Sequence, residues 1–581
     1  MILPPTIFNI DTEDCLGRNP DKGPTEGHGY ADDIKLIGTG IDECVIASNI
    51  QKDLHSLEGW AEENALSFNP NKTKVMIFTR KRMVRKPKIY LQGVELEYVE
   101  EFKYLGITID NKLNWRKHIE NQAKRAQIAL NTGRRMIGNK WGLKPKQMAW
   151  LYESIVRPIL TYGSIVWVNG LDKISIVKLL EKVKRSACMM ITGAMKSTPT
   201  AGLESILNIT PIQIHIKKEA LASYVRLQHT ASWRPRDGEP LWERGHTSTI
   251  SKIAKEIPKL MQNKDKLKTT HRSAKLFDIK IDNREDIDKV RPRPYDYMTV
   301  NCYTDGSRAN GVTGAGYLYM GKDFKEQESI FLGTEATVFQ AEVIAITEAG
   351  RSLLTKGMSG YDIRIYIDSQ SAIKAVSCYD TKSICVLECK ETLNKLGKNN
   401  KVTLNWIPGH EGHMGNEVAD RLAKRGVNMH MEGPEPFVPI GNETTKGYIK
   451  KWENKQIEIE WNNRTDCRQT KIWLNTINRA WSREILKLNR KDIRYVTQII
   501  TGHANLRRHR YIMGLEEDPN CEKCEEEEET PEHLLTKCPY FAKLRYEVLG
   551  TALPNRKHIS EYKLRTLINF IKQSKRMVNY N

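Results

Sequence analysis

The chain has 581 residues, enough for about three or four domains of the usual ~100–200 residues. Its hydrophobic content of 39% is sufficient for ordinary globular cores, and its formal net charge of +20 favours a polyanionic partner. No apolar run approaches the ~20 residues of a membrane span, and no basic segment leads into an apolar stretch at the start. We therefore expect a nuclear and/or cytoplasmic protein, neither secreted nor membrane-bound, whose 11 cysteines are reduced.

Three short motifs follow one another in the first 125 residues. GYADDIKLIG places Asp32 and Asp33 in a tight turn between β-prone flanks, NPNKTK carries Lys72, and FKYLGITIDNKLNW follows at 102–115. Two adjacent carboxylates on such a turn are how palm-type polymerases present metal ligands to a nucleotide triphosphate. In this order the motifs resemble the later palm motifs of reverse transcriptases from non-LTR (LINE-type) retrotransposons.

This resemblance implies a partial reverse transcriptase palm over residues 1–125 and a helical thumb or connection over 126–231. A polymerase palm also needs a third metal-binding aspartate on an earlier strand, and fingers that hold the template. Only 29 residues precede Tyr30, so we expect no DNA synthesis by this polypeptide alone. Two readings stay open: a truncated copy of a mobile element, or a complete RNA-directed DNA polymerase whose amino-terminal part is missing from the sequence.

The composition becomes polar and basic between residues 232 and 297, where RPRDGEP, KDKLKTTHR and VRPRPYDY occur. Such a composition predicts a basic linker. Within it, SKIAKEIPKLMQ (251–262) has the pattern of a short helix.

Segments with the pattern of strands and segments with the pattern of helices follow the linker. They predict an antiparallel meander, a helix, two buried parallel strands and a last helix. The ranges are 300–304, 315–320 and 329–332 for the meander, 339–354 for the helix, 363–367 and 403–406 for the parallel strands, and 416–425 for the last helix. Asp305 and Asp368 directly follow strands, whereas Glu342 and Asp420 lie on helices. Because neighbouring carboxylates repel one another, four that converge on one point require divalent cations.

In order and local context these four acids resemble the site of type I ribonuclease H, over residues 298–430. The resemblance implies an α/β domain with a mixed five-stranded sheet that cuts the RNA strand of RNA–DNA hybrids. It further implies that Asp305, Glu342, Asp368 and Asp420 hold two Mg²⁺ (or Mn²⁺) ions. His410 falls where the family has a histidine that assists proton transfer or product release, and His413 follows three residues later.

The resemblance also implies four residues that bind the hybrid, two of which, Thr337 and Gln370, stand at positions that contact it in related enzymes. Gly306 and Ser307 would present backbone groups to the RNA strand, whose 2′-hydroxyls distinguish it from DNA. Thr337 and Gln370 have an equally good structural explanation, as a helix cap and a surface helix residue.

The last segment, 431–581, is expected to be a helical region with a zinc knuckle at 521–538. Cys521, Cys524, His533 and Cys538 have the spacing C-x2-C-x8-H-x4-C. Two cysteines on a turn followed by a histidine and a third cysteine suit a closed tetrahedral Zn²⁺ site. Free thiols are the alternative. A Cys/His tail of this kind, preceded by a Gly-His-x-x-Leu stretch, resembles one branch of non-LTR retrotransposon proteins.

The sequence as a whole thus resembles an amino-terminally truncated Pol protein (reverse transcriptase–ribonuclease H) of a non-LTR retrotransposon. The expected activity is metal-dependent endonucleolytic cleavage of RNA–DNA hybrids, with RNA and DNA as partners. The two other hypotheses are the RNA-directed DNA polymerase described above and a non-catalytic nucleic-acid-binding remnant.

Overall fold

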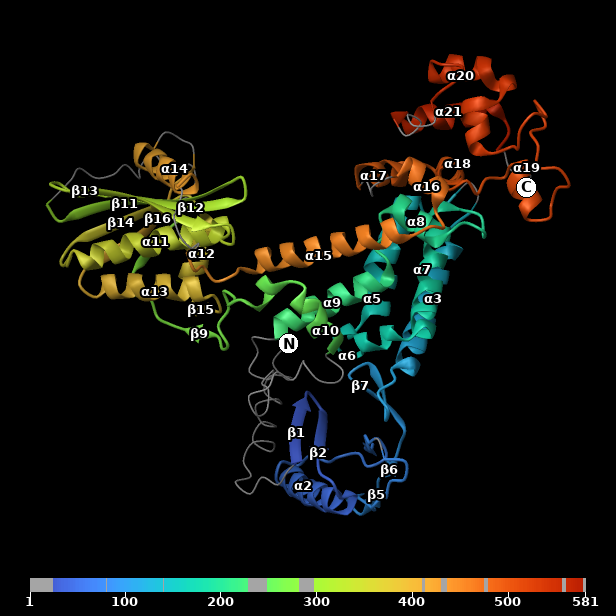
Figure 1. Cartoon of the computed structure of the whole chain (residues 1–581). Helices are drawn as coiled ribbons and strands as arrows, with labels where there is room; N and C mark the ends of the chain where they lie inside the picture. The colour runs from blue at the N-terminus through green and yellow to red at the C-terminus, as the bar shows by residue number, and fades with distance from the viewer. Residues whose placement is uncertain are drawn as a thin grey trace. The chain divides into compact units, whose positions relative to one another are not determined.

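The computed structural model describes residues 25–79, 81–138, 141–227, 248–281, 297–409, 413–429, 436–474, 479–555 and 561–577. The chain forms two compact units, and each is described here by itself. The first unit extends to Thr132 and includes Ile155–Leu160 and Asp172–Val183, and the second contains the rest (Figure 1).

The first unit combines small sheets with one long helix. A hairpin of β1 (Thr25–Tyr30) and β2 (Asp33–Gly38) precedes α2 (Glu43–Glu63), which begins where the Asp42 carboxylate accepts a hydrogen bond of 2.7 Å from the Cys44 amide. The remaining elements are β3 (Lys74–Val75), β4 (Tyr90–Leu91), β5 (Val94–Glu95), β6 (Glu97–Tyr98), β7 (Glu101–Tyr104), β8 (Ile107–Asp110) and α3 (Arg116–Arg135). Ala47 and Leu54 of α2 pack on Ile89, Leu91 and Leu96 and form the core.

Helices follow α3 along the chain. They are α4 (Pro145–Leu151), α5 (Arg157–Thr161), α6 (Ser164–Trp167), α7 (Ile174–Thr192), α8 (Thr200–Leu207) and α9 (Ile212–Leu227). α5 as far as Leu160 and α7 as far as Val183 belong to the first unit, and the others belong to the second. Lys184 and Glu204 form a buried ion pair between α7 and α8. A buried charge without its partner is strongly destabilising, so this pair fixes the two helices to each other.

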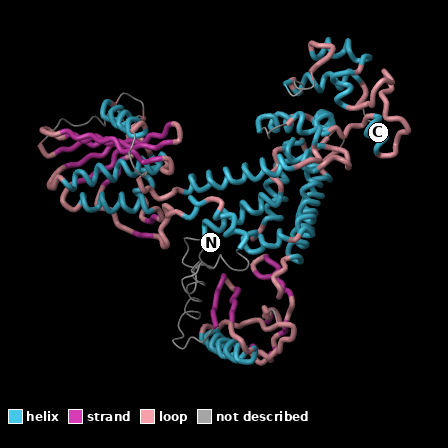
Figure 2. Tube along the Cα trace, viewed as in Figure 1, coloured by secondary structure: helices cyan, strands magenta, loops and turns pink. Residues whose placement is uncertain are grey.

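A six-stranded sheet is the largest β-structure of the second unit, and its strands are the long magenta segments in Figure 2. The strand order is β10-β16-β14-β11-β12-β13. The strands are β10 (Asp278–Lys280), β11 (Thr299–Ala309), β12 (Val312–Met320), β13 (Lys325–Gly333), β14 (Asp362–Ile367) and β16 (Lys401–Trp406). Strands β11, β12 and β13 form the predicted antiparallel meander, while β14 and β16 run parallel to β11 and β14 respectively.

Helices cover both faces of this sheet (Figure 1). They are α11 (Val338–Thr355), α12 (Gln370–Ser377), α13 (Ile384–Gly397) and α14 (Met414–Val427). Alternation along the strands decides which residues meet which helix. Val300 and Cys302 join the core cluster under α11 and α13, whereas Tyr303 packs with Ala419 and Leu422 of α14 on the other face.

The sheet corrects two predictions, because it has six strands rather than five and its first strand lies inside the predicted linker. Strand β10 pairs in parallel with β16, so that Asp278 faces Thr403. Residues 263–276 are also fastened to this domain, since the Leu267 amide donates to Lys382 O at 2.7 Å and the Ser273 amide to Tyr379 O at 3.3 Å. A three-residue strand among polar residues has no periodicity of its own, so only its distant partner reveals it.

Ahead of this fastened segment, the expected helix at 251–262 is divided. α10 (Ser248–Lys255) ends before Pro258, and a short 3₁₀ turn, η6 (Pro258–Met261), follows. A proline ring clashes with the carbonyl four residues earlier and cannot donate a backbone hydrogen bond, which ends the α-helix there.

Asp265 accepts several of the hydrogen bonds that attach residues 263–276 to the sheet domain. Its carboxylate accepts hydrogen bonds from Ser383 Oγ at 2.8 Å, the Cys385 amide at 3.0 Å and Gln340 Nε2 at 3.3 Å. Asp265→Ala should leave these donors unsatisfied and destabilise the domain by about 1–3 kcal/mol. In the full chain, Asp265→Ala should accelerate hydrogen exchange at the start of α13, whereas the control Asp278→Ala, at an exposed residue, should leave the exchange rate there unchanged. Equal exchange rates in the two variants would contradict the role of Asp265.

The carboxy-terminal part of the second unit is helical, as expected for 431–581. Its elements are α15 (Asn442–Asn463), α16 (Arg468–Trp473), α17 (Arg479–Lys487), α18 (Arg490–Thr501), α19 (Arg507–Ile512), η8 (His533–Lys537), η9 (Pro539–Phe541), α20 (Ala542–Leu549) and α21 (Leu564–Ser574). α15 contacts α9 and α18 contacts α21.

Candidate functional site

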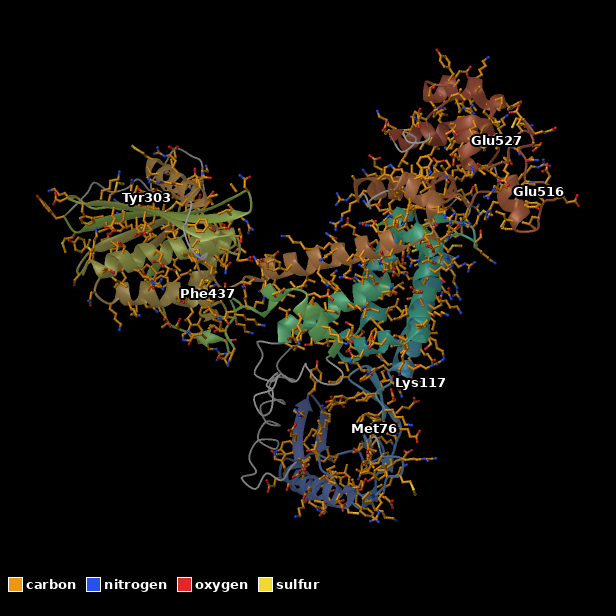
Figure 3. The ribbon with its side chains drawn as sticks, viewed as in Figure 1. Met76, Lys117, Tyr303, Phe437, Glu516 and Glu527 are labelled. Atoms are coloured by element: carbon orange, nitrogen blue, oxygen red, sulfur yellow. The ribbon has the colours of Figure 1, made fainter. Side chains whose placement is uncertain are left out.

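Asp305 was expected directly after its strand, but it lies inside β11, which continues to Ala309 because these residues pair with β12. It is the last buried residue of β11, the strand on which Tyr303 is labelled in Figure 3. The next residue, Gly306, allows β11 to approach α11 very closely. A Cβ atom on Gly306 would lie 2.7 Å from the Glu342 amide nitrogen and 2.8 Å from Ala341 Cβ, so no other residue fits without a shift of the backbone. This approach brings Asp305 and Glu342 together.

Glu342 stands on the second turn of α11, whose start is fixed by a capping box. The Thr337 side chain accepts from the Gln340 amide at 3.2 Å, and Gln340 Oε1 accepts from the Thr337 amide at 3.1 Å. Gln340 Nε2 also donates to Pro439 O at 2.8 Å, which ties the same turn to the segment preceding α15.

Asp368 enters the site from β14. Thr304 of β11 pairs with Ile367 of β14, and the two strands are parallel, so Asp305 and Asp368 lie next to each other where β14 ends and β11 continues, paired with β12 alone. The ligand oxygens of Asp305, Glu342 and Asp368 lie within 4.8 Å of one another. The structure thus brings together three of the four acids that were expected to converge.

The electrostatics of this group are unfavourable without a cation. Burial, with the nearby charge of Asp368, raises the pKa of Asp305 to about 7. Burial, with the charges of Asp305 and Asp368, raises the pKa of Glu342 to about 9. Glu342 Oε2 is buried and has no hydrogen-bond partner among the described residues. An unpartnered buried oxygen beside two other carboxylates is suited to a hard divalent cation.

Asp420 comes from α14 and stands at the margin of the group. Its charge contributes to the raised pKa of Asp305, and its own Oδ2 accepts from Lys424 Nζ at 2.6 Å. Asp420 is not one of the three residues whose ligand oxygens lie within 4.8 Å of one another. Lys424, one turn along α14, partly neutralises it.

Sequence analysis did not identify Asn416 as a residue of the site. This buried residue of α14 donates through Nδ2 to Asp368 Oδ2 at 3.4 Å and connects α14 to the carboxylate group. The sequence does carry a signal for it, because Asn416 stands four residues before Asp420 and residues four apart lie on one face of a helix. Gly415 beside it lies against the Tyr303 ring, where a Cβ atom would come within 2.4 Å.

The other predicted site residues lie as follows. His410 lies outside the described residues, and His413 is the residue that precedes the first turn of α14. Gly306 and Ser307 are half-buried at the end of β11, Thr337 caps α11, and Gln370 is exposed on the first turn of α12. Contacts of these residues with a hybrid stay predictions.

The raised pKa of Asp305 gives a prediction about stability. A carboxyl group titrates near 3.9 in an unfolded chain, so the metal-free folded state binds the proton more tightly. Stability should therefore fall as pH rises from about 4 to about 7 and stay low above that pH. In metal-free protein at pH 8, Asp305→Asn should raise the melting temperature of this domain by about 2–8 °C. The gain should shrink toward pH 4, and the exposed Asp323→Asn should show none; a gain independent of pH would contradict this explanation.

A second group with the composition of a metal site lies near the carboxy terminus. One ligand atom each of Cys521, Cys524, His533 and Cys538 lies within 4.8 Å of the others. Cys524 Sγ is 3.2 Å from His533 Nε2, and Cys521 Sγ is 3.9 Å from Cys538 Sγ. We call these four residues the Cys/His cluster.

The surroundings of the Cys/His cluster are those of a closed site. Cys521, His533 and Cys538 are buried, and burial raises the pKa of the Cys538 thiol to about 12. The Glu527 carboxylate, labelled in Figure 3, lies 3.4 Å from His533 Nδ1. A carboxylate on the far ring nitrogen fixes the tautomer in which Nε2 is free for a metal.

The predicted polymerase residues lie in the first unit. Asp32 and Asp33 are exposed at the β1–β2 turn, where Ala31 has a φ of 50°. Lys72 is exposed on a separate turn, in which the Lys72 amide donates to Asn69 O at 3.2 Å. Among the described residues, no cluster of three or more potential ligands includes Asp32 or Asp33.

Comparison with known proteins identifies the sheet domain. Residues 298–428 match the family model described as RNase H. These residues form an RNase H-like α/β domain. Over 141 residues the chain is 29% identical to a ribonuclease H of Cupriavidus necator, which covers 22% of this chain and 94% of that protein. The predicted resemblance to ribonuclease H is confirmed, and the fastened segment with β10 lies outside the matched RNase H residues.

The longer relatives are proteins of mobile elements. One is the putative 115 kDa protein in type-1 retrotransposable element R1DM of Drosophila melanogaster, 22% identical over 192 residues, or 33% of this chain and 19% of that protein. Another is the RNA-directed DNA polymerase from mobile element jockey of Drosophila funebris, 25% identical over 233 residues, or 39% of this chain and 25% of that protein. The chain thus spans about a quarter or less of these two relatives, and the predicted similarity to non-LTR retrotransposon Pol proteins is confirmed. In the described parts of the chain, every helix is too short or too polar to span a membrane.

Proposed function

We propose that the chain hydrolyses the RNA strand of RNA–DNA hybrids at the RNase H-like domain, within a protein of the retrotransposon Pol type. The observation that carries the proposal is the convergence of the carboxylates of Asp305 and Glu342, which are buried, and of Asp368, which is half-buried, to within 4.8 Å. A structural role does not require three acids so close, because each raises the cost of ionising the others. The match of residues 298–428 to the RNase H family supports the same activity.

Divalent cations suit this donor set, since it offers only carboxylate oxygens and Glu342 Oε2 has no other partner among the described residues. We assign Asp305, Glu342, Asp368 and Asp420 as ligands of two Mg²⁺ or Mn²⁺ ions. When bound, such ions would activate a water for in-line attack on the phosphate and stabilise the leaving 3′-oxygen.

Other residues of the chain position the carboxylates and balance their charge. Asn416 orients Asp368, and Lys424 balances the charge of Asp420 until the substrate and its cations arrive. We assign to Gly306 and Ser307 backbone contacts with the RNA strand, and to Thr337, which caps α11, and Gln370, on the first turn of α12, contacts with the hybrid. We assign proton transfer or product release to His410.

The test is cleavage of a labelled RNA–DNA hybrid by the purified full chain, with and without Mg²⁺. The expected result is Mg²⁺-dependent cutting of the RNA strand, with single-stranded RNA and duplex DNA left intact. Binding of the hybrid without cleavage under any divalent metal would favour a non-catalytic nucleic-acid-binding protein instead.

We further propose that the Cys/His cluster holds one Zn²⁺ ion. Three thiolates and one imidazole fill a tetrahedral coordination sphere and leave no open position, which is the pattern of a structural rather than a catalytic zinc. The Glu527 contact with His533 supports this reading. For Asp32, Asp33 and Lys72 we propose a polymerase-related segment, supported by the exposed aspartate pair on the β1–β2 turn.

A further inference from the structure

Two tryptophans of the second unit are largely exposed: Trp141 at 66% and Trp150 at 61%. Large aromatic side chains bury more apolar area than other residues, so leaving two of them in water is costly unless a partner covers them. Both belong to the segment around α4, outside the RNase H-like domain and the Cys/His cluster. None of the sites described above accounts for them.

A glycine-dependent turn holds Trp141 outward. The Gly138 amide donates to Trp141 O at 3.0 Å, and the Leu143 amide to Met136 O at 3.0 Å. Gly142 has a φ of 94°, and a Cβ atom there would lie 2.0 Å from Met136 O. A Cβ atom on Gly138 would lie 2.2 Å from the Trp141 indole nitrogen, so the ring rests on this glycine. Both close approaches require a residue without a side chain at positions 138 and 142.

The turn is attached to the junction of α17 and α18. The Arg490 guanidinium donates to Leu143 O at 2.8 Å and to Met190 O at 3.1 Å. Since Leu143 lies two residues after Trp141, the backbone that carries the indole is tied to this junction. α4 also contacts α17 directly.

Exposed cations accompany the two tryptophans. Lys144 and Lys146 flank Pro145 at the start of α4, and Lys146 lies one turn before Trp150. Lys487 and Lys491 stand on either side of the junction that binds the turn. The carboxylate of Asp492 beside them is engaged by Lys572 Nζ at 2.7 Å, and Glu484 is the one exposed acid on α17. We call Trp141, Lys144, Lys146, Trp150, Lys487 and Lys491 the tryptophan–lysine surface.

We propose that the tryptophan–lysine surface binds single-stranded nucleic acid, with bases stacked on the two indoles and phosphates held by the lysines. Charge complementarity selects this occupant, because a surface with four cations attracts a polyanion. Exposed aromatic rings need unstacked bases, which a duplex does not offer. Stacking and phosphate contacts use no 2′-hydroxyl, so RNA and DNA single strands bind alike.

The test measures binding of the full chain to fluorescein-labelled 20-mers of oligo(dT), oligo(U) and a duplex DNA by fluorescence anisotropy. Trp141→Ala/Trp150→Ala should weaken binding of both single strands by about tenfold or more. Trp141→Phe/Trp150→Phe should keep most of the affinity, which separates loss of stacking from misfolding. Lys487→Ala/Lys491→Ala should lower the slope of log affinity against log salt by about 1.4, since each phosphate contact on a single strand contributes ~0.7.

The matched control is Lys543→Ala/Tyr546→Ala, which removes an exposed cation and an exposed aromatic ring from α20. It should leave binding unchanged. The proposal is overturned if the tryptophan variant binds like this control, or if duplex binding falls as much as single-strand binding. It is also overturned if the tryptophan variant changes only the oligomeric state in light scattering, which would make the surface a protein interface.

Discussion

Asp305→Asn is expected to lower cleavage of an RNA–DNA hybrid by several orders of magnitude. The substitution keeps the shape of the side chain but removes one negative charge from the group formed with Glu342 and Asp368. The remaining carboxylates then hold divalent cations more weakly, and the charge that develops on the phosphate is less well balanced. Initial rates on a labelled hybrid, over a range of Mg²⁺ concentrations, measure the loss.

Two comparisons make this result specific. Asp278→Asn removes a carboxylate that is exposed on β10 and should cleave like the unaltered chain. His410→Ala should lose less than Asp305→Asn, because a proton-transfer group typically contributes ~10²–10⁴-fold. Calorimetric titration with Mn²⁺ should show weaker binding to Asp305→Asn, whether or not cleavage is detectable. Full activity in Asp305→Asn would show that the site is wrongly assigned.

Cys524→Ser is expected to abolish stoichiometric zinc binding by the purified chain. Cys524 Sγ lies 3.2 Å from His533 Nε2, so the thiolate and the imidazole share one centre. A hydroxyl is a much poorer zinc ligand than a thiolate, and in a small metal site the binding energy is also folding energy. Metal analysis should therefore fall from one equivalent of zinc to near zero, and hydrogen exchange should accelerate over residues 501–545.

The control for this variant is Cys378→Ser, which alters an exposed free thiol outside the Cys/His cluster. It should retain one equivalent of zinc. Cleavage of the hybrid should survive Cys524→Ser, because the carboxylate ligands belong to a separate sheet and its helices. If the unaltered protein contained no zinc and its cluster thiols reacted freely with an alkylating agent, the proposed zinc site would be refuted.

The fold of the RNase H-like domain was largely predictable from local patterns. The β-prone segments of the meander and the apolar side chains at every second residue of β14 and β16 carry their own signals, and each expected range overlaps the observed strand. β10 gave no such signal, because its three residues acquire their structure only by pairing with β16, more than a hundred positions later. Asn416 was missed for a related reason, since its contact with Asp368 requires α14 to dock on the sheet.

The sequence by itself determined the chemistry of the two candidate sites. Acids that follow β-prone runs or lie in helical patterns, and cysteines and a histidine at metal-ligand spacing, are local patterns that need no knowledge of the packing. Only the tertiary structure decided how these residues are held and what else the chain offers. Gly306 matters because β11 touches α11, Asp265 because it reaches α11 and α13, and Trp141 because two glycines and Arg490 hold it at the surface. Each depends on contacts between segments far apart in the chain, which periodicity and spacing do not encode.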